Sequence, residues 1–321
     1  MDSPRYSKSW LVTTGIARGL LGTETGERLP TIEEYCGIFD CSRGVIQKAL
    51  ATLQDSGAAE LDIQGKRGTF LKSKDEAGLF KSAGLKFITG SMPAPLNIHL
   101  AGLASGICQA MGQCPVPFTF AFVQGGKNRV DALSRGVYDF VVVTESTARI
   151  SVAENPHLEI AFPLAESEYS QPYMLYLNRP GLFELEPGMS IAADPTSTDQ
   201  WELTRLLCKD KQVELVERPY LSASIAFLSG EVDAVIYRGD LDIALNDLYP
   251  LPFTMEKRIS NKEVSVVPIS PIKLNNMQLP VVMANRKKYG MAGVIKRYLK
   301  SDLVAHIQRQ VIGMQMAPRF F

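Results

Sequence analysis

The sequence has few of the residues that build metal centres and disulfide frameworks. Its 321 residues contain five cysteines, Cys36, Cys41, Cys108, Cys114 and Cys208, with no Cys-x-x-Cys pair among them. An odd number of cysteines argues against a disulfide framework and for a reducing compartment, so these side chains are expected as small apolar residues. The three histidines, at positions 99, 157 and 306, have no zinc-ligand spacing. Neither a metal nor a cofactor is therefore predicted.

The sequence also lacks an apolar run long enough to span a membrane, and its start lacks a basic segment followed by an apolar core. A cytoplasmic protein without a membrane partner is therefore expected. The formal net charge is zero, so overall electrostatics does not indicate nucleic acid. The length suits a small domain followed by a larger one.

The motifs of common enzyme classes are incomplete. In the Gly-Leu-Ala-Ser-Gly segment at 102–106 the serine stands one place away from the position of a nucleophile elbow. The Gly-Gly-Lys-Asn segment at 125–128 lacks the upstream glycine and the Ser/Thr of a phosphate loop. The first segment is expected as a tightly packed helix, and the protein is not expected to be an enzyme.

The helical pattern near the N-terminus predicts a helix-turn-helix. Residues 8–21 have apolar side chains near helical spacing and form a leading helix. Pro30 suits the first turn of a short helix that Gly37 ends or loosens. Asp40 and Ser42 are expected to cap a second helix, in which apolar residues recur at i, i+3 and i+4 spacing: Val45, Ile46, Ala49, Leu50 and Leu53.

A basic ribbon is predicted directly after these helices. The segments 61–63 and 69–71 form two short strands around a glycine-bounded turn that contains Lys66 and Arg67. The only charged residues from 42 to 53 are Arg43 and Lys48, so this helix is locally positive although residues 1–72 as a whole are balanced. Salt-sensitive phosphate binding by the helix and the ribbon is therefore plausible.

Three blocks of this region resemble the GntR-type winged helix-turn-helix of bacterial transcription regulators. They are Gly-Glu-Arg-Leu-Pro-Thr at 26–31, Ser-Arg at 42–43 with Lys-Ala-Leu at 48–50, and Gly-Thr-Phe at 68–70. The chain departs from the pattern at Glu33, Gly44 and Gln47, where arginine, threonine and arginine are common, so the resemblance leaves the operator sequence open. A winged helix used for protein contacts is the alternative.

The resemblance implies a set of DNA-contacting residues. Arg43, Gln47 and Lys48 would enter the major groove, and Lys66 and Arg67 would touch phosphates. The full predicted set is Thr31, Ser42, Arg43, Gly44, Gln47, Lys48, Lys66, Arg67 and Thr69.

The rest of the chain predicts an α/β domain of two lobes. After a polar linker at 73–84, residues 85–321 alternate strand and helix patterns, which favours parallel sheets covered by helices. The segments 132–139 and 226–233 echo each other: each ends a helix, has a glycine suited to a left-handed cap, and enters a buried strand at an aspartate. Lobe one is predicted at 85–170 plus 280–321, and lobe two at 174–278.

The segments 171–179 and 279–286 also resemble each other and are expected to pair as a hinge where the chain crosses between lobes. The helical tail at 290–313 would return to lobe one. This body resembles the type 2 periplasmic-binding-protein fold, which serves as an effector-sensing domain in many cytoplasmic regulators. Together with the GntR-like head, the whole chain resembles regulators of the YhfZ type.

A ligand site is predicted where loops from both lobes meet, because ligands of open α/β sheets bind beyond the carboxyl ends of the strands and at helix N-termini. Arg238 is the best candidate to clamp a carboxylate or phosphate. The alternatives are loops that only cap helices, a surface pair of Arg238 with Asp240, and a core position for Tyr173. The predicted set is Ser91, Met92, Gln124, Gly125, Thr144, Glu145, Tyr173, Thr196, Ser197, Thr198, Tyr237 and Arg238.

The sequence thus predicts a dimeric transcription regulator whose partners are double-stranded operator DNA and a small acidic or polar effector. The alternative is a two-lobed metabolite-binding protein or enzyme whose winged helix is vestigial or used for docking. The identity of the effector and the sign of regulation do not follow from the sequence.

Overall fold

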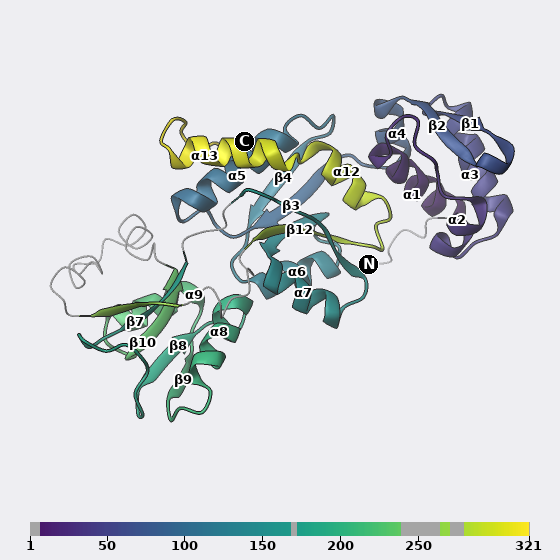
Figure 1. The fold of residues 1–321 in the computed structure, drawn as a ribbon. Helices are drawn as coiled ribbons and strands as arrows, with labels where there is room; N and C mark the ends of the chain where they lie inside the picture. The colour runs from purple at the N-terminus through teal and green to yellow at the C-terminus, as the bar shows by residue number, and fades with distance from the viewer. Residues whose placement is uncertain (1–6, 168–171, 239–263, 270–278, 321) are drawn as a thin grey trace.

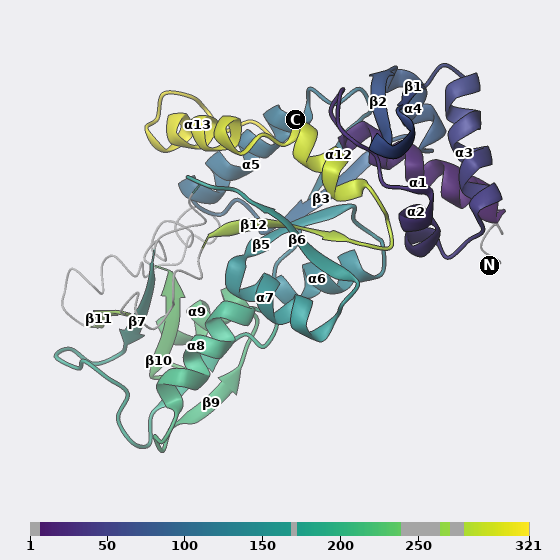
Figure 2. The same cartoon turned by 45° about the vertical axis from the view of Figure 1, so that its right-hand side comes forward.

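The computed structural model describes residues 7–167, 172–238, 264–269 and 279–320. They form an N-terminal head and two α/β lobes, and the head lies at the end of lobe one that is remote from lobe two (Figures 1 and 2). The head contains α1 (Lys8–Gly22), α2 (Ile32–Phe39), α3 (Arg43–Asp55), β1 (Ala59–Ile63), β2 (Thr69–Lys74) and α4 (Glu76–Ser82).

The helix-turn-helix prediction is confirmed, with different helix ends. Helix α2 begins after Thr31, whose hydroxyl accepts a hydrogen bond from the Glu34 N–H, while the Glu34 carboxylate accepts one from the Thr31 N–H. This capping box fixes the start of α2, so Pro30 precedes the helix and does not lie in its first turn. Gly37 lies within α2, and Asp40, at φ 48°, ends it in the left-handed conformation. Asp40 therefore does not cap α3.

The predicted ribbon is confirmed as the antiparallel pair β1–β2, whose last pair is Ile63 with Thr69. Its tip is a short 3-10 turn at Gly65–Arg67. The predicted linker at 73–84 contains regular structure: β2 extends to Lys74, and α4 follows, capped by the Asp75 carboxylate. The Lys74 ammonium donates hydrogen bonds to the carbonyls of Leu20, Leu21 and Thr23 at the end of α1, so this segment is packed onto the head.

Lobe one is built on a five-stranded sheet of order β4-β3-β5-β12-β6. Its strands are β3 (Ile88–Met92), β4 (Phe118–Phe122), β5 (Phe140–Thr144), β6 (Leu158–Pro163) and β12 (Pro280–Asn285). Its helices are α5 (Ile98–Met111), α6 (Gly126–Ser134), α7 (Glu145–Glu154), α12 (Met291–Tyr298) and α13 (Ser301–Ile312). The sheet is mixed, not parallel, because β12 returns from lobe two and runs antiparallel to β5 and β6.

Strand β5 has an almost entirely apolar sequence because both faces of the sheet are covered by helices. Phe140 and Val142 pack in the cluster that includes α5 and α12, whereas Val141 and Val143 pack with α6 and α7 on the other face. The Gly-Leu-Ala-Ser-Gly segment lies within α5, where a Cβ on Gly106 would lie 2.6 Å from the Val304 carbonyl oxygen of α13. The prediction of a tightly packed helix is therefore confirmed.

Lobe two has a five-stranded sheet of order β11-β7-β10-β8-β9. Its elements are β7 (Tyr173–Leu177), β8 (Ser190–Ala193), α8 (Thr198–Cys208), β9 (Glu214–Glu217), α9 (Tyr220–Leu228), β10 (Ala234–Arg238) and β11 (Ser265–Pro268). The expected hinge pair is wrong. Strand β7 bonds to β10 and β11 within lobe two, and β12 bonds to β5 and β6 within lobe one, so each strand completes its own sheet.

The two echo segments occupy equivalent places in the two lobes. The glycine of each has a positive φ, 78° and 79°. The Asp139 carboxylate accepts hydrogen bonds from the N–H and hydroxyl of Thr89, in β3. The Asp233 carboxylate accepts the same two bonds from Ser190, in β8. The sequence echo therefore corresponds to a repeated tie between two strands.

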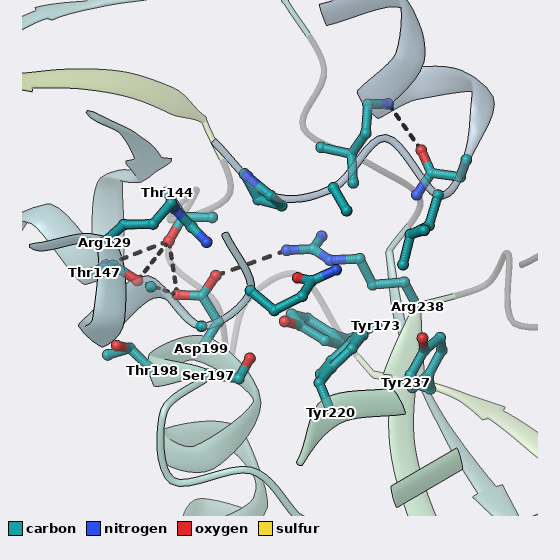
Figure 3. A pocket seen from close by; sticks show the side chains of 18 residues that line it. Arg129, Thr144, Thr147, Tyr173, Ser197, Thr198, Asp199, Tyr220, Tyr237 and Arg238 are labelled. Atoms are coloured by element: carbon teal, nitrogen blue, oxygen red, sulfur yellow. Dashed lines mark hydrogen bonds and ion pairs between the residues drawn. The ribbon is translucent and has the colours of Figure 1, made fainter. Parts of the chain in front are cut away.

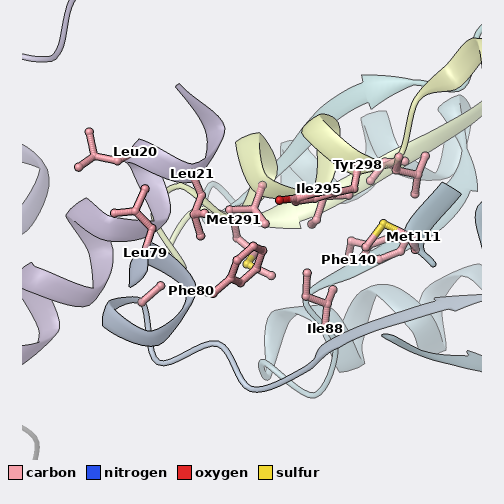
Figure 4. Packing of buried hydrophobic residues seen from close by; sticks show 14 of the residues in the cluster. Leu20, Leu21, Leu79, Phe80, Ile88, Met111, Phe140, Met291, Ile295 and Tyr298 are labelled. Carbon is pink, nitrogen blue, oxygen red and sulfur yellow. The ribbon is translucent and has the colours of Figure 1, made fainter. Parts of the chain in front are cut away.

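The head and lobe one share one continuous hydrophobic core. Leu79 and Phe80 of α4 lie with Leu20 and Leu21 of α1 on one side and Met291 and Ile295 of α12 on the other (Figure 4). Helices α1 and α12 approach so closely that a Cβ on Gly22 would lie 2.8 Å from the Gly293 Cα. The head is therefore fixed to lobe one, while lobe two has its own cores.

Candidate functional site

The first exposed face of interest is the N-terminal part of α3. Ile46 and its apolar neighbours face the head core, while Ser42, Arg43, Gly44, Gln47 and Lys48 are exposed together. Ser42 occupies the N-cap position, but its side chain makes no capping hydrogen bond. The structure thus presents the predicted major-groove residues on one surface, as binding to a groove requires.

Arg43 on this face is paired with a carboxylate. Its Nη1 lies 3.0 Å from Glu33 Oε1 of α2, and both side chains are exposed. Glu33 is the position at which the family pattern commonly has arginine. The pair holds negative charge beside Arg43, which lowers the local attraction for phosphates.

The ribbon tip presents Lys66 and Arg67 to solvent. Gly68 closes the turn at φ 103°, and a Cβ there would lie 2.6 Å from Arg28 Nε. Thr69, also predicted to contact DNA, is half-buried at the start of β2. A Gly-bounded tip with two exposed cations has the form needed to lie against a phosphate backbone.

Thr31 has a structural role in the head. Its hydroxyl and N–H complete the capping box with Glu34. The bond from the Thr31 N–H to the Glu34 carboxylate, with a smaller contribution from the Thr31 hydroxyl, holds the pKa of that carboxyl below its ordinary value. A DNA contact from Thr31 stays a prediction.

The second feature is a small cavity between the two lobes, of about 80 Å³. Eight of the residues predicted for the ligand site line it: Gln124, Gly125, Thr144, Tyr173, Ser197, Thr198, Tyr237 and Arg238. The structure thus brings together side chains that are more than 100 positions apart in the sequence. The cavity has room for several water-sized groups.

Four predicted residues lie outside the cavity lining. Ser91 and Met92 are buried within β3, which continues to Met92 because that residue pairs with Phe122. Glu145 forms an ion pair with Arg149 one turn later on α7. The Thr196 hydroxyl donates to Asp194, and its carbonyl accepts from the Lys127 N–H, so Thr196 joins the lobes at the rim.

Five helices begin at this cavity, which explains why polar loop residues gather there. Asn97 caps α5, Gly126 begins α6, Thr144 caps α7, Ser197 precedes α8, and Tyr220 begins α9. The N-terminus of a helix carries partial positive charge and unpaired N–H groups. Their convergence favours an anion in the cavity.

Arg238 ends β10 and is 6% exposed. Its guanidinium carbon lies 4.2 Å from the ring centroid of Tyr173, and Nη2 lies 3.7 Å from Asp199 Oδ2 (Figure 3). The guanidinium thus packs on an aromatic face and against a carboxylate within the cavity. Asp240, its alternative partner, lies outside the described residues.

Several residues of the cavity lining were not predicted from the sequence. One of them is Arg129 on α6, whose side chain is buried. Its Nε donates to the Val142 carbonyl at 3.2 Å, and its Nη1 donates to the Val123 carbonyl at 2.7 Å. The signal that could have identified it is an arginine one position before the apolar Val130, on the helix that follows the glycine pair. These bonds fix the side chain between the residue that follows β4 and the middle of β5.

Asp199, in the first turn of α8, does not cap its own helix. Its Oδ1 lies 2.8 Å from Thr144 Oγ1 and 3.3 Å from Thr147 Oγ1 (Figure 3). The same oxygen lies 2.7 Å from Ser146 Oγ. All three hydroxyls belong to the start of α7 in lobe one. The side chain crosses the cleft because those donors satisfy a carboxylate that is only 12% exposed.

Tyr220 was also missed, and it covers the lobe-two side of the cavity. Its ring stacks on that of Tyr237, with centroids 4.4 Å apart and planes at 27°. The two tyrosines and Tyr173 form an aromatic wall beside Arg238. Such a wall favours a ligand with an apolar portion next to its charged group.

Within the described ranges, no group of three or more His, Cys, Asp or Glu side chains is arranged to hold a metal ion. Among the same residues, no helix has the length and hydropathy needed to cross a bilayer.

Comparison with known proteins identifies related domains. Residues 75–320 match the family described as the YhfZ C-terminal domain, and residues 24–71 match a family described as a helix-turn-helix domain. The protein YhfZ of Escherichia coli strain K12 is 29% identical over 312 residues, which cover 96% of each chain. The crystal structure of YhfZ from Shigella flexneri covers 73% of this chain and 94% of its own, with 23% identity and a TM-score of 0.59.

Solved structures of binding proteins also show a lower similarity to this chain. One is an ancestral arginine-binding protein bound to arginine, which covers 70% of this chain and 97% of its own at 17% identity and a TM-score of 0.46.

Proposed function

The chain belongs to the YhfZ C-terminal domain family, and from that premise we propose that it is a DNA-binding transcription regulator controlled by a small acidic effector. The observation that carries the proposal is the continuous core between the head and lobe one. This core fixes the exposed face of α3 to the lobe that forms one wall of the cleft. A ligand that changes the position of lobe two would therefore act on a body that includes the DNA-reading head.

The head would read DNA with α3 and hold the backbone with the ribbon. Arg43, Gln47 and Lys48 would enter the major groove, and Lys66 and Arg67 would contact phosphates on the adjacent backbone. Because one head covers one half-site, the functional form would be a homodimer on a two-fold operator.

The effector would be a small anion with an apolar part. Arg129, Asp199 and Arg238 are the charged side chains of the lining, with a net positive charge, and the starts of five helices add to it. Arg238 would bind the anionic group, and Tyr173, Tyr220 and Tyr237 would cover the apolar part.

A direct test combines DNA retardation with ligand screening on the full chain. The purified protein should retard DNA from the region upstream of its own gene, and Arg43→Ala should weaken specific binding by about tenfold or more. The double variant Lys66→Ala, Arg67→Ala should weaken binding to all DNA sequences. The dependence of the binding constant on salt concentration should also decrease, by the amount expected for the loss of about two phosphate contacts. Lys209→Ala, in lobe two, is the control.

For the effector, a thermal-shift screen of small carboxylates and phosphate esters should raise the melting temperature of the wild type and leave that of Arg238→Ala unchanged. Sequence-independent DNA binding that Arg43→Ala leaves intact, together with no response to any acid, would contradict the proposal.

A further inference from the structure

The start of α7 binds a carboxylate that belongs to the other lobe. Oδ1 of Asp199 lies within hydrogen-bond distance of the hydroxyls of Thr144, Ser146 and Thr147. Thr144 is also the N-cap of α7 and accepts from the Thr147 N–H at 3.3 Å. Hydroxyls gathered at a helix N-terminus form an environment suited to an oxyanion.

The other oxygen of the same carboxylate faces Arg238. Oδ2 lies 3.7 Å from Nη2, and the two side chains are 12% and 8% exposed. Asp199 thus occupies the point at which the α7 hydroxyls and the guanidinium converge inside the cavity (Figure 3). A group that belongs to lobe two is satisfied by donors from lobe one, so it holds the two lobes together.

A second contact lies at the same edge of the cleft. The Lys127 N–H of α6 donates to the Thr196 carbonyl at 3.1 Å, and a Cβ on Gly125 would lie 2.5 Å from Thr196 Oγ1. These contacts show that the loop before α8 is already seated on lobe one around the Asp199 carboxylate.

We infer that Thr144, Ser146 and Thr147, together with Arg238, form an oxyanion subsite that Asp199 fills while the effector is absent. A ligand carboxylate or phosphate takes this subsite by displacing Asp199, because two carboxylates cannot share one set of donors without strong repulsion. The inference rests on the proposed function for the existence of an effector. It adds the group that the effector replaces and the residues that receive it.

Displacement also links binding to the spacing of the lobes. With Asp199 in the subsite, the lobes are joined through this side chain, and with a ligand there they are joined through the ligand. The position of lobe two relative to the head then depends on which anion occupies the subsite. Effector affinity is reduced by the free energy needed to release Asp199.

The ligand-free protein provides the first test. Asp199→Ala removes the carboxylate, and Asp199→Asn keeps its shape without the charge. The control is Glu202→Ala, which removes an exposed carboxylate of the same helix, one that pairs with Arg205. Hydrogen exchange should be about fivefold faster at residues 144–154 in Asp199→Ala, with a smaller increase in Asp199→Asn. Small-angle scattering should show a larger radius of gyration for Asp199→Ala and no change for Glu202→Ala.

Anion binding provides the second test, with inorganic phosphate and succinate as probes in titration calorimetry. Asp199→Ala should bind them about tenfold more tightly than the wild type, and the binding should restore slow exchange at 144–154. The added substitution Ser146→Ala should remove most of this gain, because it deletes a donor of the subsite.

Unchanged exchange and scattering in Asp199→Ala would overturn the inference, as would weaker anion binding by that variant. The exchange and scattering measurements use neither DNA nor effector. Their failure would therefore leave the proposed regulator in place, whereas failure of the proposed function would appear in the DNA-retardation and Arg238→Ala measurements.

Discussion

Tyr298 of α12 donates a hydrogen bond of 2.8 Å to Oε2 of Glu76 in α4. The other oxygen of this carboxylate pairs with Arg297, which also pairs with Glu24 in the turn after α1. A polar cluster thus borders the shared core, and it joins residues of the head to α12 of lobe one.

This cluster predicts a loss of stability in acid. Burial alone would raise the pKa of Glu76, but hydrogen bonds from Tyr298 and Arg297 outweigh it and leave the pKa below the ordinary value of 4.5. A lowered pKa means that the carboxylate stabilises the folded state above pH 4.5, and that this contribution is lost as the pH falls through the lowered value. Denaturant unfolding at several pH values should show this decrease.

Glu76→Gln should flatten that part of the pH profile, since the amide does not titrate. Glu202→Gln, on an exposed face of lobe two, should leave the profile unchanged. A wild-type profile that persists in Glu76→Gln would contradict the assignment.

The shared core predicts that damage at Phe80 reaches both sides of the junction. Phe80 is 3% exposed, and its ring centroid lies 6.0 Å from that of Tyr298. Phe80→Ala should therefore lower the free energy of unfolding by about 3–5 kcal/mol. Hydrogen exchange should accelerate in both α1 and α12. Phe87→Ala removes a ring that is 57% exposed and should cost less than about 0.5 kcal/mol. Faster exchange confined to the head would show that the two parts are not one unit.

The Arg43–Glu33 pair predicts a substitution that strengthens DNA binding. Glu33→Gln should release Arg43 and remove a negative charge beside the groove-facing surface, which should tighten DNA binding about two- to fivefold at low salt. The gain should shrink at high salt because the charges are exposed. Fluorescence anisotropy with Asp55→Asn as the control, at the other end of α3, measures it. Weaker binding by Glu33→Gln would mean that Glu33 contributes a favourable contact.

Gly125 predicts a sensitive point in the cleft. Its φ is 82°, and an added Cβ would lie 2.5 Å from Thr196 Oγ1, so Gly125→Ala combines backbone strain with a clash between the lobes. Gly230→Ala shares the positive φ but has open space around it. Unfolding by denaturant should show a loss of about 1 kcal/mol for Gly230→Ala and at least 1 kcal/mol more for Gly125→Ala. Equal losses would show that the contact with Thr196 relaxes freely.

The sequence by itself determined the elements whose signals are local. Helical spacing identified α1 and α3, the glycine-bounded basic turn identified the ribbon, and the repeated Gly-x-x-Asp pattern identified equivalent places in two lobes. These signals depend on neighbours within about one or two turns of chain. The convergence of loops near Arg238 could also be predicted, because ligands of α/β sheets bind beyond the carboxyl ends of the strands.

Only the tertiary structure decided the contacts between distant segments. Asp199 of α8 reaches Thr144, the N-cap of α7, across 55 positions. Tyr298 reaches Glu76 across 222 positions, and Glu76 lies in the segment that the sequence predicts to be a polar linker. A buried polar group forms hydrogen bonds with whichever groups the folded chain brings near it. Because these partners are far away in the sequence, the residues next to the group do not indicate them.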